Sequence, residues 1–218
     1  MERPILLETA TTILLTIYVI TAILMLRKLY ETLIRRGWVP SSASYLIRKL
    51  VHLLAAGPVT LAIPFLYESP LLPSLVAIVM GLILWERKRR GKVMSWFQTS
   101  DNNNEITFIL AWGTSILLLW RLTGDLSLAI LPAAYISLGD GVTGLARVAL
   151  RGRREKHWSG NLAMFTVTLP IGVIVAGLPG AVSALASSIA EKFQMKYLDD
   201  NITITGITVA ILALAFTP

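Results

Sequence analysis

The chain alternates long apolar runs with short polar segments. Eight runs approach or exceed the roughly 20 residues that an α-helix needs to cross a bilayer; they cover residues 5–26, 45–66, 71–85, 106–121, 125–147, 161–178, 180–196 and 202–217. The third run is short, and the seventh is only weakly apolar. The pattern predicts an all-α, polytopic membrane protein with seven or eight transmembrane helices, folded as a single integral membrane domain over residues 1–218.

The composition agrees with this pattern. Hydrophobic residues make up 55% of the 218 residues and charged residues only 15%, whereas soluble domains carry about one quarter charged residues. A soluble core of this length cannot bury so many apolar side chains, so the composition excludes a soluble globular protein. The chain has no cysteine, which excludes disulfides, thiolate metal ligands and a cysteine nucleophile.

Basic residues outnumber acidic ones by 20 to 13, and they lie on one side of the predicted membrane. With the N-terminus outside, alternate loops place eighteen of the 20 on the cytoplasmic side, and only Arg3 and Arg121 lie elsewhere. This distribution follows the positive-inside rule, so we expect these residues to face the cytoplasm and anionic lipids rather than nucleic acid.

Most acidic residues fall on the same side. They are Glu31, Glu86, Asp101, Glu105, Asp140, Glu155, Glu191, Asp199 and Asp200. The positive-inside rule does not place acidic residues, so carboxylates among basic loops indicate a site for a phosphate-bearing ligand with Mg²⁺. We therefore expect the active site at the cytoplasmic face.

The segment at residues 137–161 carries the strongest chemical signal. Asp140 lies inside a predicted transmembrane run, where a carboxylate is costly unless it faces a cavity or a cation. Three glycines surround it, Gly139, Gly141 and Gly144, which permit a break in the helix or close approach of a ligand. Four basic residues suited to phosphate follow: Arg151, Arg153, Arg154 and Lys156. The alternative is a neutralised aspartate at a glycine-rich helix crossing, followed by an ordinary basic loop.

Three further segments carry weaker signals. Arg48, Lys49 and His52 begin the second run and suit a phosphate or a hydroxyl, although such residues also extend toward lipid headgroups. In the other two segments, N-capping is the simpler interpretation for the polar residues that precede predicted helices, which are Asn104 and Glu105 in one and Asp199, Asp200 and Asn201 in the other. The last segment also contains Glu191, which lies in the inner half of the weakly apolar seventh run. Sequence motifs of P-loop, dinucleotide-binding, zincin and serine-hydrolase sites are absent.

The four segments together, RKLVHLLAAG, NEITF, GDGVTGLARVALRGRREKHWSGN and AEKFQMKYLDDNITI, resemble the polyprenol kinase family, which includes dolichol kinase, phytol kinase and CTP-dependent diacylglycerol kinase. The resemblance covers residues 45–205, after an N-terminal span and basic loop at 1–44 and before the end of the last span at 206–218. The family pattern falls on Arg48, Lys49, His52, Gly57, Glu105, Gly139, Asp140, Gly144, Lys156, Gly160, Glu191, Asp200, Asn201 and Thr203. The chain departs from it at Val142 and Thr143, in the more basic segment 150–153, and at Thr205, where the family has proline.

The resemblance implies a kinase that transfers a phosphoryl group from CTP to a membrane isoprenoid alcohol with Mg²⁺, and the short chain favours phytol, farnesol or geranylgeraniol over dolichol. Asp140 is expected at the centre, as a magnesium ligand or as the base, with Glu191 as a catalytic candidate and Asp200 and Glu105 as metal candidates. His52 and Lys156 are further catalytic candidates. The expected phosphate and nucleotide contacts are Arg48, Lys49, Gly139, Gly144, Arg153, Arg154, Gly160 and Asn201.

Two other functions use the same charges. A CTP-dependent cytidylyltransferase acting on phosphatidate or a similar lipid phosphate would release pyrophosphate instead of CDP. A small anion transporter would also hold charges in a cavity, but we expect a transporter to show matching halves, and the sequence has no visible repeat. Nothing in the sequence sets the oligomeric state.

Overall fold

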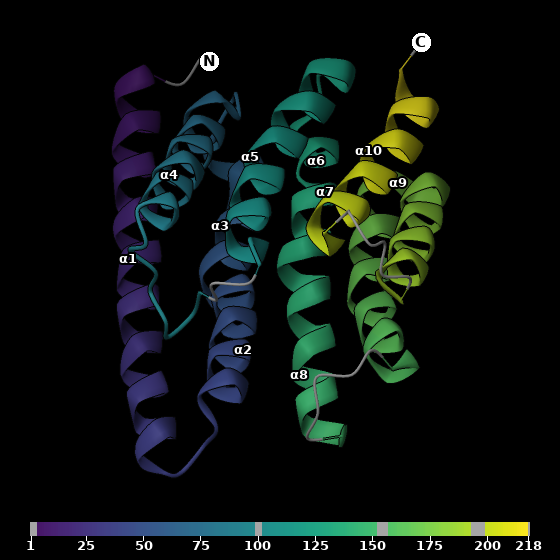
Figure 1. Cartoon of the computed structure of the whole chain (residues 1–218). Coiled ribbons are helices and arrows are strands. Elements are labelled where there is room, and N and C mark those ends of the chain that lie inside the picture. Colours follow the sequence, from purple (N-terminus) through teal and green to yellow (C-terminus); the bar gives the residue numbers. More distant parts are fainter. Residues whose placement is uncertain (1–3, 99–101, 152–156, 193–198, 218) are drawn as a thin grey trace.

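A computed structural model describes residues 4–98, 102–151, 157–192 and 199–217, and this part of the chain is helical with no strand. Ten α-helices and two π-helical segments follow one another (Figure 1): α1 (Ile5–Arg35), α2 (Pro40–Val51), η1 (His52–Ala56), α3 (Gly57–Leu66), α4 (Leu71–Arg89), α5 (Asn104–Thr123), α6 (Leu126–Ala129), α7 (Leu131–Ala134), η2 (Tyr135–Gly139), α8 (Asp140–Arg151), α9 (Trp158–Lys192) and α10 (Asp200–Phe216). The all-α fold class is confirmed.

Five helical stretches are long and apolar enough to cross a membrane. They are Ile5–Arg35, Pro40–Leu66, Asn104–Thr123, Leu126–Ala149 and Trp158–Lys192. Each predicted apolar run coincides with a helix or part of one, but α4 does not meet this criterion and α10 is a shorter apolar helix. The described structure is therefore compatible with a membrane protein, while seven or eight crossings remain a prediction.

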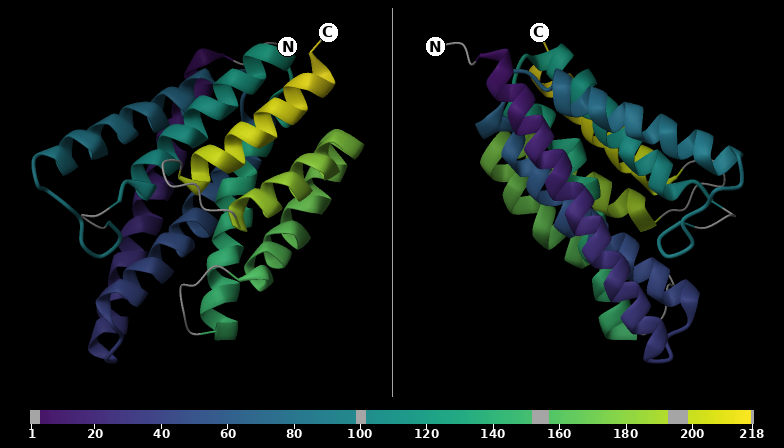
Figure 2. Two further views of the ribbon diagram at one scale, coloured as in Figure 1. Left: turned by 45° about the vertical axis from the view of Figure 1, so that its right-hand side comes forward. Right: turned by 90° about the vertical axis from the view of Figure 1, so that its left-hand side faces the viewer.

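The sixth predicted run and the described part of the seventh, residues 180–192, lie in α9, which is broken at Gly177 into two helical arms. This glycine has φ 58° and ψ −132°, outside the helical region, so residues 158–176 and 178–192 form two arms. The arms approach so closely that a Cβ atom on Gly172 would lie 2.8 Å from the carbonyl carbon of Gly180. The left view of Figure 2 shows the sharp bend. The GLPG sequence therefore forms a reversal between two helical arms, at the boundary that the apolar pattern predicts between the sixth and seventh runs.

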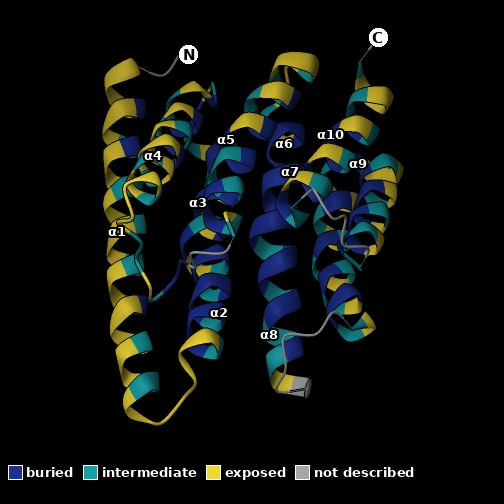
Figure 3. Ribbon diagram, viewed as in Figure 1, coloured by how far each residue is buried: buried dark blue, intermediate teal, exposed yellow. Residues whose placement is uncertain are grey.

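The helix formed by α6, α7, η2 and α8 runs through the middle of the molecule. It is mostly buried, as its dark colour in Figure 3 shows, and it packs against α9, α5 and α2. At its start, Asp125 caps α6 by accepting hydrogen bonds from the backbone N–H groups of Ser127 and Leu128. This central helix carries Asp140 into the interior of the bundle.

Helix α1 lies at the edge of the bundle and packs mainly against α2 (Figure 2, right). Large apolar side chains along its outer face are exposed, among them Leu6, Leu14 and Met25. Exposed apolar surface also covers much of α4 and α9. Such extensive apolar surface suits contact with lipid better than contact with water.

Candidate functional site

Charged side chains gather inside the bundle, where α2 and η1 meet α8, α5 and α9. Seven ionisable residues are each no more than 7% exposed: Arg48, Lys49, His52, Glu105, Asp140, Arg147 and Glu191. Burying charge is costly unless it is paired or serves a ligand. The chemistry of the site therefore depends on which of these seven residues pair with one another and which remain available to a ligand.

Lys49 and Asp140 form the centre of this cluster. The Lys49 Nζ atom donates to both carboxylate oxygens of Asp140, at 2.5 and 2.6 Å. The Nδ1 atom of His52 lies 3.3 Å from Asp140 Oδ2. Lys49 and His52 thus lie next to Asp140, although positions 49, 52 and 140 are far apart along the chain.

Two π-helical segments bring these residues together. η1 begins at His52, η2 ends directly before Asp140, and the two segments pack against each other. A π-helix is rare and often occurs at a functional site, because its extra residue turns the following side chains to a new face. Glycines permit the close approach: a Cβ atom on Gly57 would lie 2.6 Å from the side chain of Leu138, and one on Gly141 would lie 2.6 Å from that of Leu53.

His52 is held by an aromatic neighbour. Its ring stacks on that of Phe108, with 3.8 Å between the ring centroids and 15° between the planes. Phe108 lies one turn into α5, so α5 fixes the plane of the imidazole. Because Nδ1 faces Asp140, Nε2 lies on the opposite side of the ring and can exchange a proton with a ligand.

Arg48 is buried without a charged partner. No hydrogen bond or ion pair involves its guanidinium among the described residues, and its Cζ atom lies 5.7 Å from the centre of the Tyr45 ring. The side chain lines a cavity together with His52 and Glu105. An arginine in such a place is suited to binding phosphate oxygens.

Glu105 lies in the first turn of α5 and is only 4% exposed. Lys88 Nζ lies 3.6 Å from its Oε1 atom, and neither carboxylate oxygen has a hydrogen-bond partner among the described residues. Glu105 is therefore an acceptor that is desolvated and incompletely satisfied, next to Arg48 and His52 at the cavity wall. This combination is typical of a binding site.

Glu191 belongs to a second ion pair that the sequence analysis did not identify. Arg147 donates from Nη1 and Nη2 to the two oxygens of Glu191, at 3.0 and 2.7 Å, and Asn161 Nδ2 donates to Glu191 Oε2 at 3.0 Å. A helical spacing of seven residues after Asp140 places Arg147 on the same face of α8, and this spacing is the signal that identifies it. Glu191 is thus tied to α8 and to the first arm of α9.

The glycines predicted to contact nucleotide lie at helix contacts. A Cβ atom on Gly139 would lie 2.7 Å from Thr168, one on Gly144 would lie 2.7 Å from Lys49 Cδ, and one on Gly160 would lie 2.6 Å from Arg147 Nε. The space beside each glycine is thus filled by protein side chains. A nucleotide-binding role for these glycines stays a prediction.

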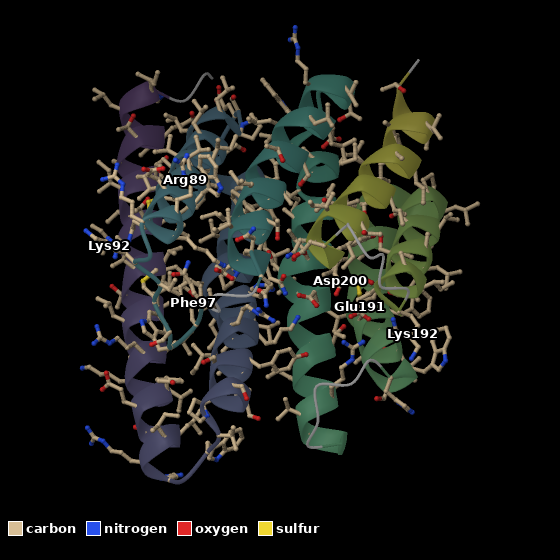
Figure 4. All side chains as sticks on the ribbon, viewed as in Figure 1. Arg89, Lys92, Phe97, Glu191, Lys192 and Asp200 are labelled. Atoms are coloured by element: carbon tan, nitrogen blue, oxygen red, sulfur yellow. The ribbon has the colours of Figure 1, made fainter. Side chains whose placement is uncertain are left out.

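The Asp-Asp-Asn segment caps α10 and connects it to α5. The side chain of Asp199 accepts a hydrogen bond from the Asn201 backbone N–H, and Asn201 Nδ2 donates to Asp199 and to the backbone oxygen of Asn104. Burial raises the pKa of the Asp199 carboxyl above its ordinary value. Asp200 lies in the first turn of α10 and is labelled with Glu191 in Figure 4. The N-cap interpretation of this segment is confirmed.

The predicted magnesium ligands do not form one group. Asp140 is bonded to Lys49, Glu105 faces Lys88, and Asp200 lies at the start of α10. No group of three or more histidine and acidic residues suited to a metal is present in the described ranges. These residues therefore do not fit a magnesium site built from protein ligands alone. The predicted phosphate residues Arg153, Arg154 and Lys156 lie outside the described residues.

A cavity of about 350 Å³ adjoins the charged cluster. It runs between α1, η1, α3, α4 and α5, and its lining is apolar except at the ends. This volume lies within the range of pockets that bind small molecules, about 300–1,000 Å³. The molecule thus combines buried charges with an adjacent apolar space. Comparison with protein-family models, curated proteins and solved structures finds no match to this chain.

Proposed function

We propose that the protein is a kinase that phosphorylates the hydroxyl of a membrane isoprenoid alcohol and uses CTP as the phosphoryl donor. The observation that carries this proposal is the position of His52, which touches Asp140 on one side and lines an apolar cavity with the unpaired Arg48 on the other. A lipid alcohol needs an apolar space for its tail and polar groups for its hydroxyl, and this arrangement offers both. The choice of CTP and of an isoprenoid rests on the resemblance to polyprenol kinases.

His52 is the proposed general base. The carboxylate of Asp140, 3.3 Å from Nδ1, would orient the imidazole, so that Nε2 accepts the proton of the lipid hydroxyl while the hydroxyl oxygen attacks the γ-phosphorus. The new bond joins that oxygen to phosphorus, the bond between phosphorus and the β-phosphate oxygen breaks, and CDP leaves. Asp140 then acts as a positioning residue, which also stabilises the imidazolium.

Positive charge is the second requirement of phosphoryl transfer. Arg48 and Lys49 are the described candidates for contacts with phosphate oxygens, and the basic residues of the segment 151–156 would add further charge. Magnesium would enter as the complex of the triphosphate, coordinated mainly by phosphate oxygens and water, since Mg²⁺ commonly takes only one or two carboxylates from the protein. In this role Mg²⁺ neutralises charge on the transferred group.

We place the N-terminus outside and the active site at the cytoplasmic face. The turn between α1 and α2 and the end of α8 lie at the same end of the molecule, opposite the two termini (Figure 1). Arg35 and Arg36 lie at the first of these segments, and Arg147 and Arg151 at the second. The positive-inside rule assigns such segments to the cytoplasm. A water-soluble nucleotide would then approach from the side that holds most of the positive charge.

Product analysis tests the proposal. The purified protein is incubated with Mg²⁺, with CTP or ATP, and with farnesol, geranylgeraniol, phytol, dolichol, diacylglycerol or phosphatidate. We expect CDP and the monophosphate of an isoprenoid alcohol. Pyrophosphate and a CDP-lipid would instead establish a cytidylyltransferase, and anion uptake into vesicles without turnover would establish a transporter.

Two variants test the roles of the residues. We expect His52→Gln and Asp140→Asn to lose nearly all turnover, because each removes a member of the proposed base pair. Glu31→Gln is the matched control, since Glu31 is exposed and pairs only with Arg27 on the same helix. Normal turnover by well-folded His52→Gln protein would refute His52 as the base.

A further inference from the structure

The cavity beside the charged cluster has different polar residues in its wall near its two ends. At the end near the start of α5, its wall contains Arg48, His52 and Glu105. At the other end lie Thr12 and Tyr67, whose hydroxyl oxygens are 2.9 Å apart in a buried hydrogen bond. Between these ends the lining consists of apolar side chains from α1, α3, α4 and α5. The cavity is therefore elongated and amphipathic.

The length of this cavity follows from the residues of α1 that line it. Thr12 lines one end, and Leu24, on the same helix, lies near the other. At a rise of about 1.5 Å per residue, these positions are about 18 Å apart along the axis of α1. Half of a bilayer's hydrocarbon core is about 15 Å thick, so the cavity is as long as the lipid tails of one leaflet.

The polar end needs a ligand that both donates and accepts hydrogen bonds. Arg48 offers donors with no described acceptor, and neither carboxylate oxygen of Glu105 accepts a hydrogen bond from a described residue, since Lys88 Nζ lies 3.6 Å away. A hydroxyl group is both a donor and an acceptor, and it carries no charge into the apolar space. A single-chain alcohol therefore matches the cavity along its whole length.

We infer that the cavity holds the tail of a single-chain membrane alcohol, and that the hydrogen-bonded pair of Thr12 and Tyr67 sets the greatest tail length that binds. This inference rests on the proposed kinase function for the identity of the ligand as a substrate. A tail longer than the cavity must displace Tyr67, which is 3% exposed, or separate it from Thr12.

Competition binding tests the inference without turnover. Labelled geranylgeraniol is displaced from the detergent-solubilised protein by geraniol, farnesol, geranylgeraniol or dolichol, and by diacylglycerol. We expect geraniol, farnesol and geranylgeraniol to compete with similar affinity. Their tails move from apolar detergent into an apolar cavity, so a longer tail adds little binding free energy. Dolichol and diacylglycerol should compete at least about tenfold less well, the cost of leaving one buried hydrogen-bonding group unsatisfied.

Two matched tryptophan variants on α1 locate the tail. Val19 lines the middle of the cavity, whereas Leu14 is 67% exposed on the outer face of the same helix. We expect Val19→Trp to weaken geranylgeraniol binding at least about tenfold while geraniol still binds, and Leu14→Trp to bind like the unaltered protein. Equal effects of the two variants would overturn the tail site.

Tyr67→Ala tests the end of the cavity. We expect it to admit longer prenols, so that the affinity for dolichol approaches that for geranylgeraniol. Tyr67→Phe keeps the ring but loses the hydrogen bond to Thr12, so we expect its cutoff to lie between those of the unaltered protein and Tyr67→Ala. If Tyr67→Ala does not fold, Val19→Trp still decides the inference. A length cutoff without any CDP formation would support the tail site and refute the kinase, whereas turnover unaffected by Val19→Trp would support the kinase and refute the tail site.

Discussion

The ammonium group of Lys49 lies 2.5 and 2.6 Å from the two carboxylate oxygens of Asp140, inside the bundle and 91 positions away along the chain. This pair joins α2 to α8, and His52 and Arg48 extend from it toward the cavity. The two charges satisfy each other, so Asp140 has its negative charge fixed in place. That fixed charge orients the imidazole of His52 in the proposed mechanism.

A double-mutant cycle tests this pair. Asp140→Asn leaves the Lys49 ammonium buried without an anion, so we expect a loss of about 3–5 kcal/mol of unfolding free energy. Adding Lys49→Met should recover most of this loss, because neither charge then remains. The midpoint of denaturation in detergent measures stability, and product formation measures activity. Additive losses in the double variant would contradict the coupling, and restored turnover would contradict the role of Asp140.

For Arg48 we expect a substitution to lower activity without lowering stability. Because its guanidinium has no described charged partner, Arg48→Met should leave the unfolding midpoint unchanged or raise it. We expect kcat/KM to fall by about a hundredfold, the effect of losing one charge-assisted contact to phosphate. The matched control is Arg27→Met on exposed α1, where turnover should be unchanged. Full activity of Arg48→Met would show that Arg48 contacts neither substrate.

Gly144 tests whether the position of Lys49 matters. A Cβ atom here would lie 2.7 Å from Cδ and Cε of Lys49, so Gly144→Ala should push Nζ away from Asp140 and lower both turnover and stability. Gly206→Ala is the matched control in α10, where the Cβ atom meets nothing within 4 Å. That variant should gain up to about 1 kcal/mol from the better helix propensity of alanine. Equal behaviour of the two variants would refute the packing argument.

The pair of Arg147 and Glu191 is expected to serve structure more than chemistry. Arg147→Met leaves a carboxylate that is 1% exposed without its cation, and we expect a loss of about 3–5 kcal/mol. The double variant Arg147→Met with Glu191→Gln should recover stability and retain measurable turnover. Thermal unfolding and CDP formation provide the two measurements. Loss of all turnover in the stable double variant would instead give Glu191 the catalytic role that the sequence resemblance implies.

The sequence determined the helical class and the chemistry of the centre. The apolar runs predict helices at the positions where they occur, since a backbone in an apolar medium must satisfy its own hydrogen bonds. Asp140 was identifiable because a carboxylate in such a run needs a cation. Lys49 and His52 were identifiable as candidates, although the apolar pattern does not show which of them contacts Asp140.

Only the tertiary structure decided the partners. The apolar pattern places a boundary at the GLPG segment, but only the backbone at Gly177 shows that the two helical arms fold back on each other there. The pairing of Arg147 with Glu191 spans 44 positions, and the separation of Asp140, Glu105 and Asp200 follows from the places where α8, α5 and α10 pack. Periodicity fixes the face of a helix on which a residue lies, whereas contacts across helices depend on the glycines and π-helical turns that set how closely and at which rotation the helices meet.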